Sequence, residues 1–146
     1  MAEQVYFEDI EVGAEIPPLV KQPSTRQLVL WAGASRDLAE IHYDKDAALA
    51  AGLPGVVVHG RLKAAFLGQL MTDWIGEKGV LRKLTCSYRG LDVPGQPIQC
   101  KGKVTRKYAE GDACCVECEV WTENAKEERT TIGTAVAVLP SRGLER

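Results

Sequence analysis

The sequence contains no apolar run long enough to cross a membrane. A spanning helix needs roughly 20 consecutive apolar residues, and no stretch of the 146 residues approaches that length. A block of basic residues is also missing, and the formal net charge of −2 offers little attraction to a phosphate backbone. The first residues, MAEQVYFEDI, lack the basic and then apolar pattern of a secretory signal. We therefore predict a cytoplasmic protein without a membrane or nucleic-acid partner.

The chain also lacks the even number of cysteines that a disulfide framework needs. The chain has five, and an odd number without a secretory signal indicates free thiols, not a disulfide framework. Cys115 and Cys118 form a C-x-x-C pair, but the alternating sequence CCVECEV is typical of a strand. The two thiols would then point to opposite faces, and no further metal ligand lies nearby in the sequence. We predict buried or half-buried thiols and no metal site.

The first half of the chain carries helix signals. Ser24 or Thr25 can cap a helix that runs to about residue 35, and Asp44 can cap a short second helix that stops at Gly52. Residues 61–76 are apolar around most of the helical circumference. A helix of this composition and length is a buried core element. These signals predict three helices, the third of them central to the core.

From residue 80 onwards, apolar and polar residues alternate with the period of a strand. Residues 81–90, 97–108, 112–123 and 129–140 are separated by turn-like sequences, which predicts successive antiparallel strands with one core face. Residues 13–23 contain the adjacent prolines Pro17 and Pro18, which confine this segment to a sheet edge or a loop. The pattern predicts an α+β domain with a curved antiparallel sheet around one helix. A single sheet has open edges, so we expect at least a dimer.

Two short stretches could carry chemistry. SRDLAEIHYD, residues 35–44, places Asp37 and His42 in apolar surroundings, where they could act as an acid–base pair. The alternative is that Asp37 caps a local turn and His42 bonds a backbone carbonyl. In VVVHGRL, Gly60 precedes the long helix, so its unpaired N–H at the positive end of the dipole could hold an oxyanion. The alternative is that Gly60 only begins the helix and His59 lies on the surface.

Together and in this order, the two stretches resemble the signature of the MaoC-like enoyl-CoA hydratases, the (R)-specific branch of the hot-dog fold. That signature reads Ser-Gly-Asp-x-Asn-Pro-x-His-x-Asp, then an Ala-rich helix, a Gly/Pro turn and an apolar run leading into His-Gly. The matching residues are Ser35, Asp37, His42, Asp44, Ala47, Gly55, His59 and Gly60. The later sequence YRGLDVPGQPIQCKGKVTRK is similar to the family's downstream strands. The resemblance implies one hot-dog domain over residues 1–146, with a short helical overhang beside the sheet and central helix.

The resemblance also implies a reaction, the hydration of trans-2-enoyl-CoA to (R)-3-hydroxyacyl-CoA or the reverse dehydration. The implied catalytic residues are Asp37, His42 and Gly60, and the implied substrate-binding residues are Val58, His59 and Arg89. Coenzyme A would enter as part of the substrate, with no other cofactor. Further basic residues could meet its phosphates, although a solvated strand face explains each of them as well. These residues are Arg61, Lys63, Arg82, Lys83, Lys101, Lys103 and Arg106.

Two positions depart from the family pattern, since Ala39 and Glu40 stand where the signature has Asn and Pro. The variant sequence is similar to the small partner subunits of heteromeric hydratases in steroid side-chain degradation. A homodimer or higher homo-oligomer and a complex with a second hot-dog subunit are therefore both open. Two other functions also remain open, a non-catalytic or half-active subunit and an acyl-CoA thioesterase.

Overall fold

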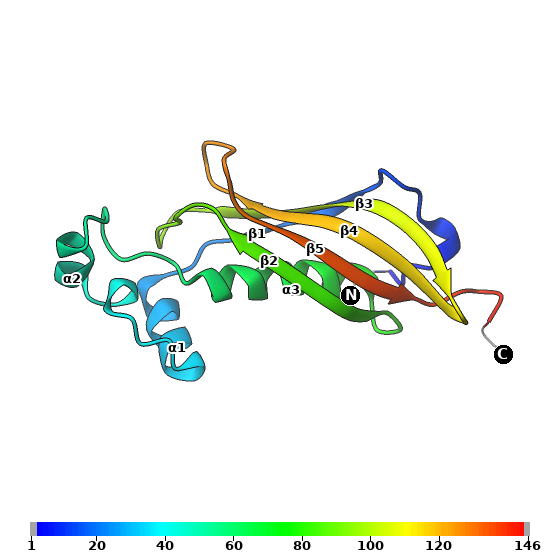
Figure 1. The fold of residues 1–146 in the computed structure, drawn as a ribbon, viewed down its shortest axis with the longest axis horizontal. Helices are drawn as coiled ribbons and strands as arrows, with labels where there is room; N and C mark the ends of the chain where they lie inside the picture. Colours follow the sequence, from blue (N-terminus) through cyan, green and yellow to red (C-terminus); the bar gives the residue numbers. More distant parts are fainter. Residues whose placement is uncertain (1–2, 145–146) are drawn as a thin grey trace.

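The computed structural model describes residues 3–144 and shows an antiparallel sheet wrapped around one long helix (Figure 1). The five strands lie in the order β1-β3-β4-β5-β2. They are β1 (Glu15–Lys21), β2 (Val80–Tyr88), β3 (Ile98–Glu110), β4 (Ala113–Glu123) and β5 (Arg129–Leu139). The helix α3 (Gly60–Ile75) contacts every strand. The predicted α+β arrangement is confirmed.

The helical overhang is also present. The helices α1 (Thr25–Ser35) and α2 (Lys45–Ala50) lie beyond one end of the sheet, with a 3-10 turn at Glu40–His42 between them (Figure 1). A further 3-10 turn at Phe7–Asp9 precedes β1. No helix among the described residues combines the length and the apolar character of a membrane span.

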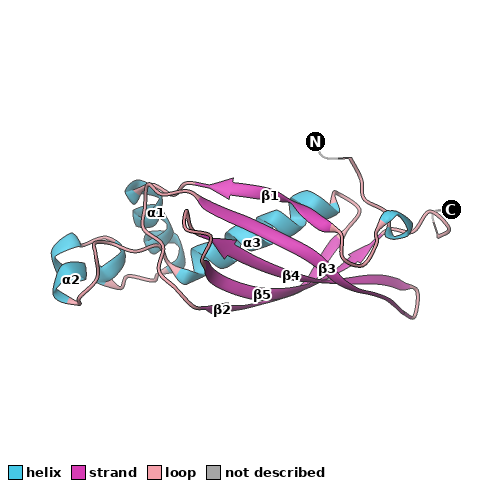
Figure 2. Cartoon of the chain, turned by 90° about the horizontal axis from the view of Figure 1, so that it is seen from above, coloured by secondary structure: helices cyan, strands magenta, loops and turns pink. Residues whose placement is uncertain are grey.

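The prediction of successive antiparallel strands fails at one step, because β2 and β3 are not neighbours in the sheet. Strands β3, β4 and β5 follow one another across the sheet, but β2 pairs with β5 instead of β3. The connection between β2 and β3 therefore crosses one end of the sheet before β3 begins. At the opposite edge, β1 lies beside β3 (Figure 2), and its pairing shifts between Ile16 and Leu19. Pro17 and Pro18 occupy this shift because proline has no N–H to donate to a strand partner.

The helix ends follow the predicted signals. The Ser24 hydroxyl accepts a hydrogen bond from the Gln27 backbone N–H at 3.1 Å, and the Asp44 carboxylate accepts from the first turn of α2. These side chains satisfy donors that have no acceptor inside the helix. Gly76 ends α3 with a φ of 73°, a left-handed conformation that glycine adopts without strain.

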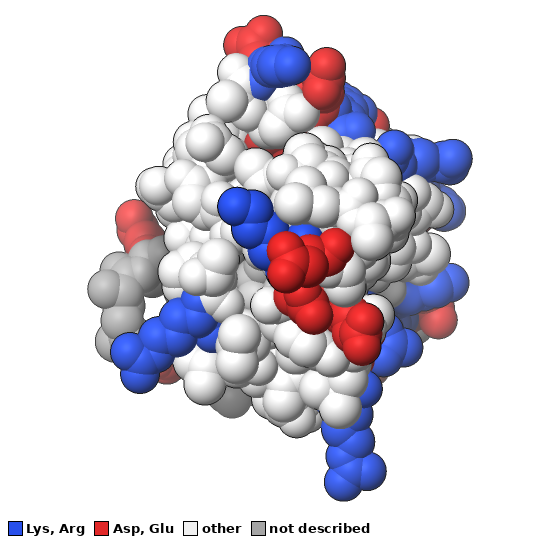
Figure 3. Space-filling view, turned by 90° about the vertical axis from the view of Figure 1, so that its left-hand side faces the viewer, with Lys and Arg blue, Asp and Glu red and all other residues white. Residues whose placement is uncertain are grey.

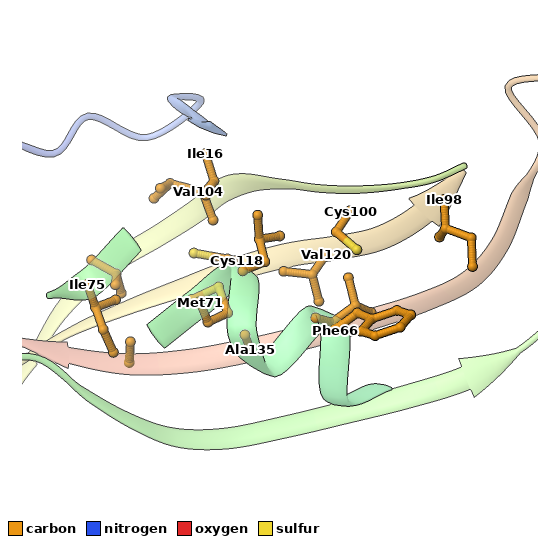
Figure 4. Close-up of a cluster of buried hydrophobic side chains, with 14 of the residues drawn as sticks. Ile16, Phe66, Met71, Ile75, Ile98, Cys100, Val104, Cys118, Val120 and Ala135 are labelled. Atoms are coloured by element: carbon orange, nitrogen blue, oxygen red, sulfur yellow. The ribbon is translucent and has the colours of Figure 1, made fainter. Parts of the chain in front are cut away.

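The core lies between α3 and the concave face of the sheet (Figure 4). The alternation predicted for β3 and β4 is confirmed, since Cys100, Cys118 and Val120 are fully buried against Phe66 and Met71 of the helix. The helix α3 is not buried around its whole circumference, as its composition suggested, because one face is exposed to solvent. Ala65 is exposed, together with Gln69, Thr72 and Asp73, whereas Lys63 is buried.

The cysteines are free thiols, as predicted, and all five are buried or half-buried. Burial raises the pKa of both Cys100 and Cys118 to about 12. Because the thiolate is the reactive form, we expect iodoacetamide to spare these two in the native protein at mildly alkaline pH and to label the half-buried Cys114. Peptide mass mapping after a timed reaction would check this. Labelling of Cys100 as fast as Cys114 would contradict the buried core that the fold gives it.

Candidate active site

The loop between α1 and α2 holds Asp37 and His42 in fixed positions. Arg36 ends α1 in a left-handed conformation with a φ of 61°, and the Ser35 hydroxyl then accepts from the Asp37 backbone N–H at 3.2 Å. Further along, the Tyr43 hydroxyl donates to the Leu38 carbonyl at 3.1 Å. The loop is therefore closed by local hydrogen bonds on both sides of the 3-10 turn.

The two side chains face each other. The His42 Nε2 atom lies 3.9 Å from the Asp37 Oδ2 atom, with side-chain exposures of 10% and 37%. The His42 Nδ1 atom lies 2.7 Å from the Val57 carbonyl oxygen. A carbonyl can only accept, so Nδ1 carries the proton and the neutral ring presents the lone pair of Nε2. The 3.9 Å gap is too long for a direct hydrogen bond, but one water oxygen could lie about 2.8 Å from both atoms.

His59 lies beneath this pair. Its ring stacks on the His42 ring at a centroid separation of 3.7 Å and an interplanar angle of 20°. Its Nε2–H lies 3.4 Å from the Asp37 carbonyl oxygen, and its Nδ1 has no partner among the described residues. The alternative that His59 is a surface residue is wrong, because it is completely buried. Its predicted contact with substrate does not fit this burial, whereas support of Asp37 and His42 does.

The His59 ring gives the fold a pH dependence. Its pKa is lowered from the usual 6.5, first by burial and then by the charge that His42 can carry. As the pH falls, His59 is therefore protonated at a higher pH in the unfolded chain than in the folded chain. We expect the His59 contribution to stability to be complete above pH 6.5 and to be lost progressively below it. Urea unfolding from neutral to mildly acidic pH would measure this, and a His59→Asn variant should show a shallower slope.

Asp37, His42 and His59 also offer three possible metal ligands within 4.8 Å of one another. Imidazole nitrogens bind metals through lone pairs in the plane of the ring. Because the two rings are stacked, their lone pairs lie in roughly parallel planes and do not converge on one ion. The arrangement fits proton exchange better than metal coordination.

Gly60 begins α3, as predicted, directly after the buried His59. The hydrogen bonds found among the described residues give its N–H no acceptor. A Cβ at this position would lie 3.0 Å from the Tyr88 ring, so the absence of a side chain lets this ring lie against the backbone. The sequence did not predict this contact of Tyr88. A backbone N–H without an acceptor at the start of a long helix is suited to a developing negative charge.

The other predicted binding residues differ in their surroundings. Val58 belongs to the hydrophobic core, and its N–H donates to the Asp92 carbonyl at 2.8 Å. Arg89 is exposed directly after Tyr88, and its backbone N–H donates to Thr130. Lys63 cannot meet coenzyme phosphates as suggested, because its side chain is only 2% exposed and is bonded inside the protein.

The burial of Lys63 and its pairing with Asp92 were not predicted from the sequence. The Lys63 Nζ atom lies 3.0 Å from the Asp92 Oδ2 atom, and the same oxygen accepts from the Thr130 hydroxyl. The sequence did contain one indication that Lys63 is buried. Lys63 precedes Phe66 and Leu67 by three and four residues, which places it on the buried face of α3. The position of Asp92 in a loop gave no comparable signal.

The dyad opens toward solvent in the single chain. A cavity of about 420 Å³ lies between β1 and α3, where Pro17, Leu70 and Trp74 contribute to its lining. That cavity does not include Asp37 or His42.

Comparison with known proteins identifies the family. Residues 10–132 match the family model described as MaoC like domain. The chain belongs to the MaoC-like dehydratase family. The matched range includes Asp37, His42 and Gly60.

Solved structures of this family confirm the predicted hot-dog fold. The R-hydratase PhaJ1 from Pseudomonas aeruginosa superposes with a TM-score of 0.82 at 20% identity, over 95% of this chain and 88% of that chain. A chain of the ChsH1–ChsH2 complex from Mycobacterium tuberculosis gives 0.78 at 22% identity, over 88% and 98%. At these identities the likeness concerns the fold.

A curated relative is also similar in sequence. The 3-oxo-4,17-pregnadiene-20-carboxyl-CoA hydratase beta subunit of Mycobacterium tuberculosis is 29% identical over 73 residues, half of this chain. The matched segment spans 57% of that relative, and only 4% of another curated relative.

Proposed function

We propose that this MaoC-like protein hydrates trans-2-enoyl-CoA thioesters to (R)-3-hydroxyacyl-CoA, or catalyses the reverse dehydration. The observation that carries the proposal is the 3.9 Å separation of Asp37 and His42, with the His42 tautomer fixed by Val57. Gly60 directly follows His59 in the chain, and the His59 ring stacks on the His42 ring. The proposed oxyanion donor is therefore one residue away from a ring that contacts the dyad. In the proposed mechanism the acid–base pair and the backbone donor act on the same substrate.

The proposed reaction begins with a water held between Asp37 and His42. Its two hydrogens point to the Asp37 carboxylate and the His42 Nε2 atom, which leaves an oxygen lone pair free for the substrate. The thioester carbonyl accepts from the Gly60 N–H, and this draws electron density away from Cβ. The water oxygen adds to Cβ as the dyad takes one proton, the double-bond electrons move to Cα, and the dyad returns a proton there.

The coenzyme A part of the substrate would lie along the same end of the molecule. We propose that Arg89 and Arg61 meet its phosphates, since both are exposed beside Tyr88 and Gly60. The chemistry needs no other cofactor, because the thioester itself makes Cβ electrophilic.

We propose a second hot-dog chain as the partner that closes the site, most simply a second copy. The end of the molecule that carries the overhang is mostly uncharged (Figure 3). Exposed apolar side chains belong to its helices and loop, and large exposed apolar patches are typical of interaction surfaces. They are Val29, Leu30, Leu38, Tyr43 and Leu49.

A heteromeric or half-active subunit is the second candidate. The observations that favour it are the similarity to a hydratase beta subunit and the presence of Ala39 where the family signature has Asn. A thioesterase, the third possibility, would attack the carbonyl carbon and would not need an acid–base pair placed for Cβ.

The decisive experiment is incubation of the purified protein with crotonyl-CoA and with bulkier enoyl-CoA thioesters. We expect loss of the enoyl absorbance and formation of the 3-hydroxyacyl product, with no free thiol. Release of coenzyme A thiol would indicate a thioesterase. Inactivity that a co-encoded hot-dog partner relieves, even with His42→Ala in this chain, would assign the catalytic site to the partner.

A further inference from the structure

A buried ion pair lies directly behind the proposed site. The Lys63 Nζ atom is 3.0 Å from the Asp92 Oδ2 atom, and the side chains are 2% and 4% exposed. Among the ion pairs of the described residues, this is the one in which both partners are buried. Lys63 also donates to the Gly90 carbonyl at 2.9 Å. The proposed reaction uses neither charge, although both lie within one turn or loop of Gly60 and Tyr88.

The loop that carries Asp92 is attached to the sheet by Thr130. The Thr130 hydroxyl donates to Asp92 at 2.5 Å and lies 2.9 Å from the Thr122 hydroxyl. Its carbonyl accepts from the backbone N–H groups of Arg89 and Gly90. The pairing of β4 and β5 shifts register beside Thr130, and such a bulge can turn a side chain toward a new partner. The loop is therefore held by α3 on one side and by β5 on the other.

One peptide unit connects this anchor to His42. The peptide that joins Val57 and Val58 accepts from His42 Nδ1 through its carbonyl, at 2.7 Å. The N–H of the same peptide donates to the Asp92 carbonyl, at 2.8 Å. Because a peptide unit is planar, the orientation that Asp92 imposes on the N–H also fixes the carbonyl that faces His42. Linked hydrogen bonds of this kind polarise one another.

We propose that Lys63 and Asp92 are positioning residues, which fix the tautomer and orientation of His42 through the peptide between Val57 and Val58. Lys63 holds Asp92, Asp92 holds the peptide, and the peptide holds the Nδ1 proton. The lone pair of Nε2 is thereby kept facing Asp37. The kinetic consequence rests on the hydratase function proposed above, but the tautomer does not.

The tautomer can be measured without any substrate. The chain has only two histidines, so the ¹⁵N resonances of His42 are identified by their loss in a His42→Asn variant. In the wild type we expect His42 to have its proton on Nδ1. In Lys63→Met we expect a mixture of both tautomers. Lys126→Met, which removes an exposed lysine from the turn between β4 and β5, is the matched control and should leave the spectrum unchanged.

The kinetic test uses the same variants. Because the ion pair is buried, the proposed substrate would not contact it. We therefore expect Lys63→Met to lower kcat about tenfold to a hundredfold, as misplacement of a catalytic group does, with little change in KM. Thr130→Val, which removes one hydrogen bond to Asp92 and keeps both charges, should show a smaller change in the same direction. It also provides a measurement if Lys63→Met does not fold.

A purely structural role predicts a different result in a double variant. Lys63→Met with Asp92→Leu removes both charges, and apolar replacement of a buried ion pair often restores stability. We expect this variant to fold while kcat stays at least tenfold low and the His42 tautomers stay mixed. Full recovery of kcat and of the Nδ1–H tautomer along with stability would overturn the proposal.

The two proposals fail in distinguishable ways. Wild-type protein inactive on every enoyl-CoA, but with a His42 tautomer that depends on Lys63, would remove the hydratase function and retain the positioning network. The opposite result would be an active wild type whose Lys63→Met and Thr130→Val variants fold and keep both the His42 tautomer and kcat unchanged. It would retain the hydratase function and remove the positioning network.

Discussion

Replacement of His42 with alanine, or of Asp37 with asparagine, is expected to lower kcat for enoyl-CoA hydration by about 10²–10⁴-fold, the usual contribution of a positioned acid or base. Each change removes one of the two groups that hold and deprotonate the water across the 3.9 Å gap. Initial rates at saturating substrate would measure the effect. Because the two groups act on the same water, the double variant should be little worse than either single variant.

Glu40→Gln is the matched control for Asp37→Asn. It makes the same chemical change on an exposed carboxylate in the same loop. We expect it to keep the wild-type rate. If Asp37→Asn and His42→Ala both retain nearly the full rate of an active wild type, the dyad is not the catalytic group and the proposed mechanism is wrong.

Lys63→Met is expected to destabilise the fold by about 3–5 kcal/mol, the typical cost of removing one partner from a buried ion pair. The change leaves the Asp92 carboxylate buried, with Thr130 as its remaining described side-chain donor. This is a large share of the roughly 5–15 kcal/mol that stabilises a typical domain. Urea denaturation followed by circular dichroism would give the difference in unfolding free energy.

The surface control for this prediction is Lys126→Met, which should change the unfolding free energy by no more than about 0.5 kcal/mol. Lys63→Met with Asp92→Leu should be more stable than Lys63→Met alone, because the unpaired charge is gone. A stability of Lys63→Met equal to the wild type would mean that the Asp92 carboxylate finds water or another donor in the variant.

The elements of the fold were predictable because their signals are local. The apolar alternation of β3 and β4, the cap at Ser24 and the stop at Gly76 each depend on residues within a few positions of one another. The order of the strands was not predictable in this way. The pairing of β2 with β5 depends on the path of the connection around the end of the sheet, and no periodicity records that path.

The residues of the candidate site also fall into two groups, those that the sequence predicted and those that it did not. Asp37, His42 and Gly60 were found from the sequence, because their order and spacing match a family motif. The surroundings of His59 and Lys63 were misjudged, since both were assigned to contact with substrate or solvent. In each case the contacts that decide the role come from distant residues, such as the 29 positions between Lys63 and Asp92.

The sequence by itself determined which segments are helices and strands, the family to which the chain belongs, and which acid, imidazole and glycine are candidates for catalysis. Only the tertiary structure decided that one histidine lies beneath the other, and that a buried lysine is tied through a carboxylate and a peptide plane to the His42 ring. The physical reason is that periodicity and motifs report local backbone preference and chemistry. The tautomer of a ring and the burial of a charge depend on atoms that only the folded chain brings together.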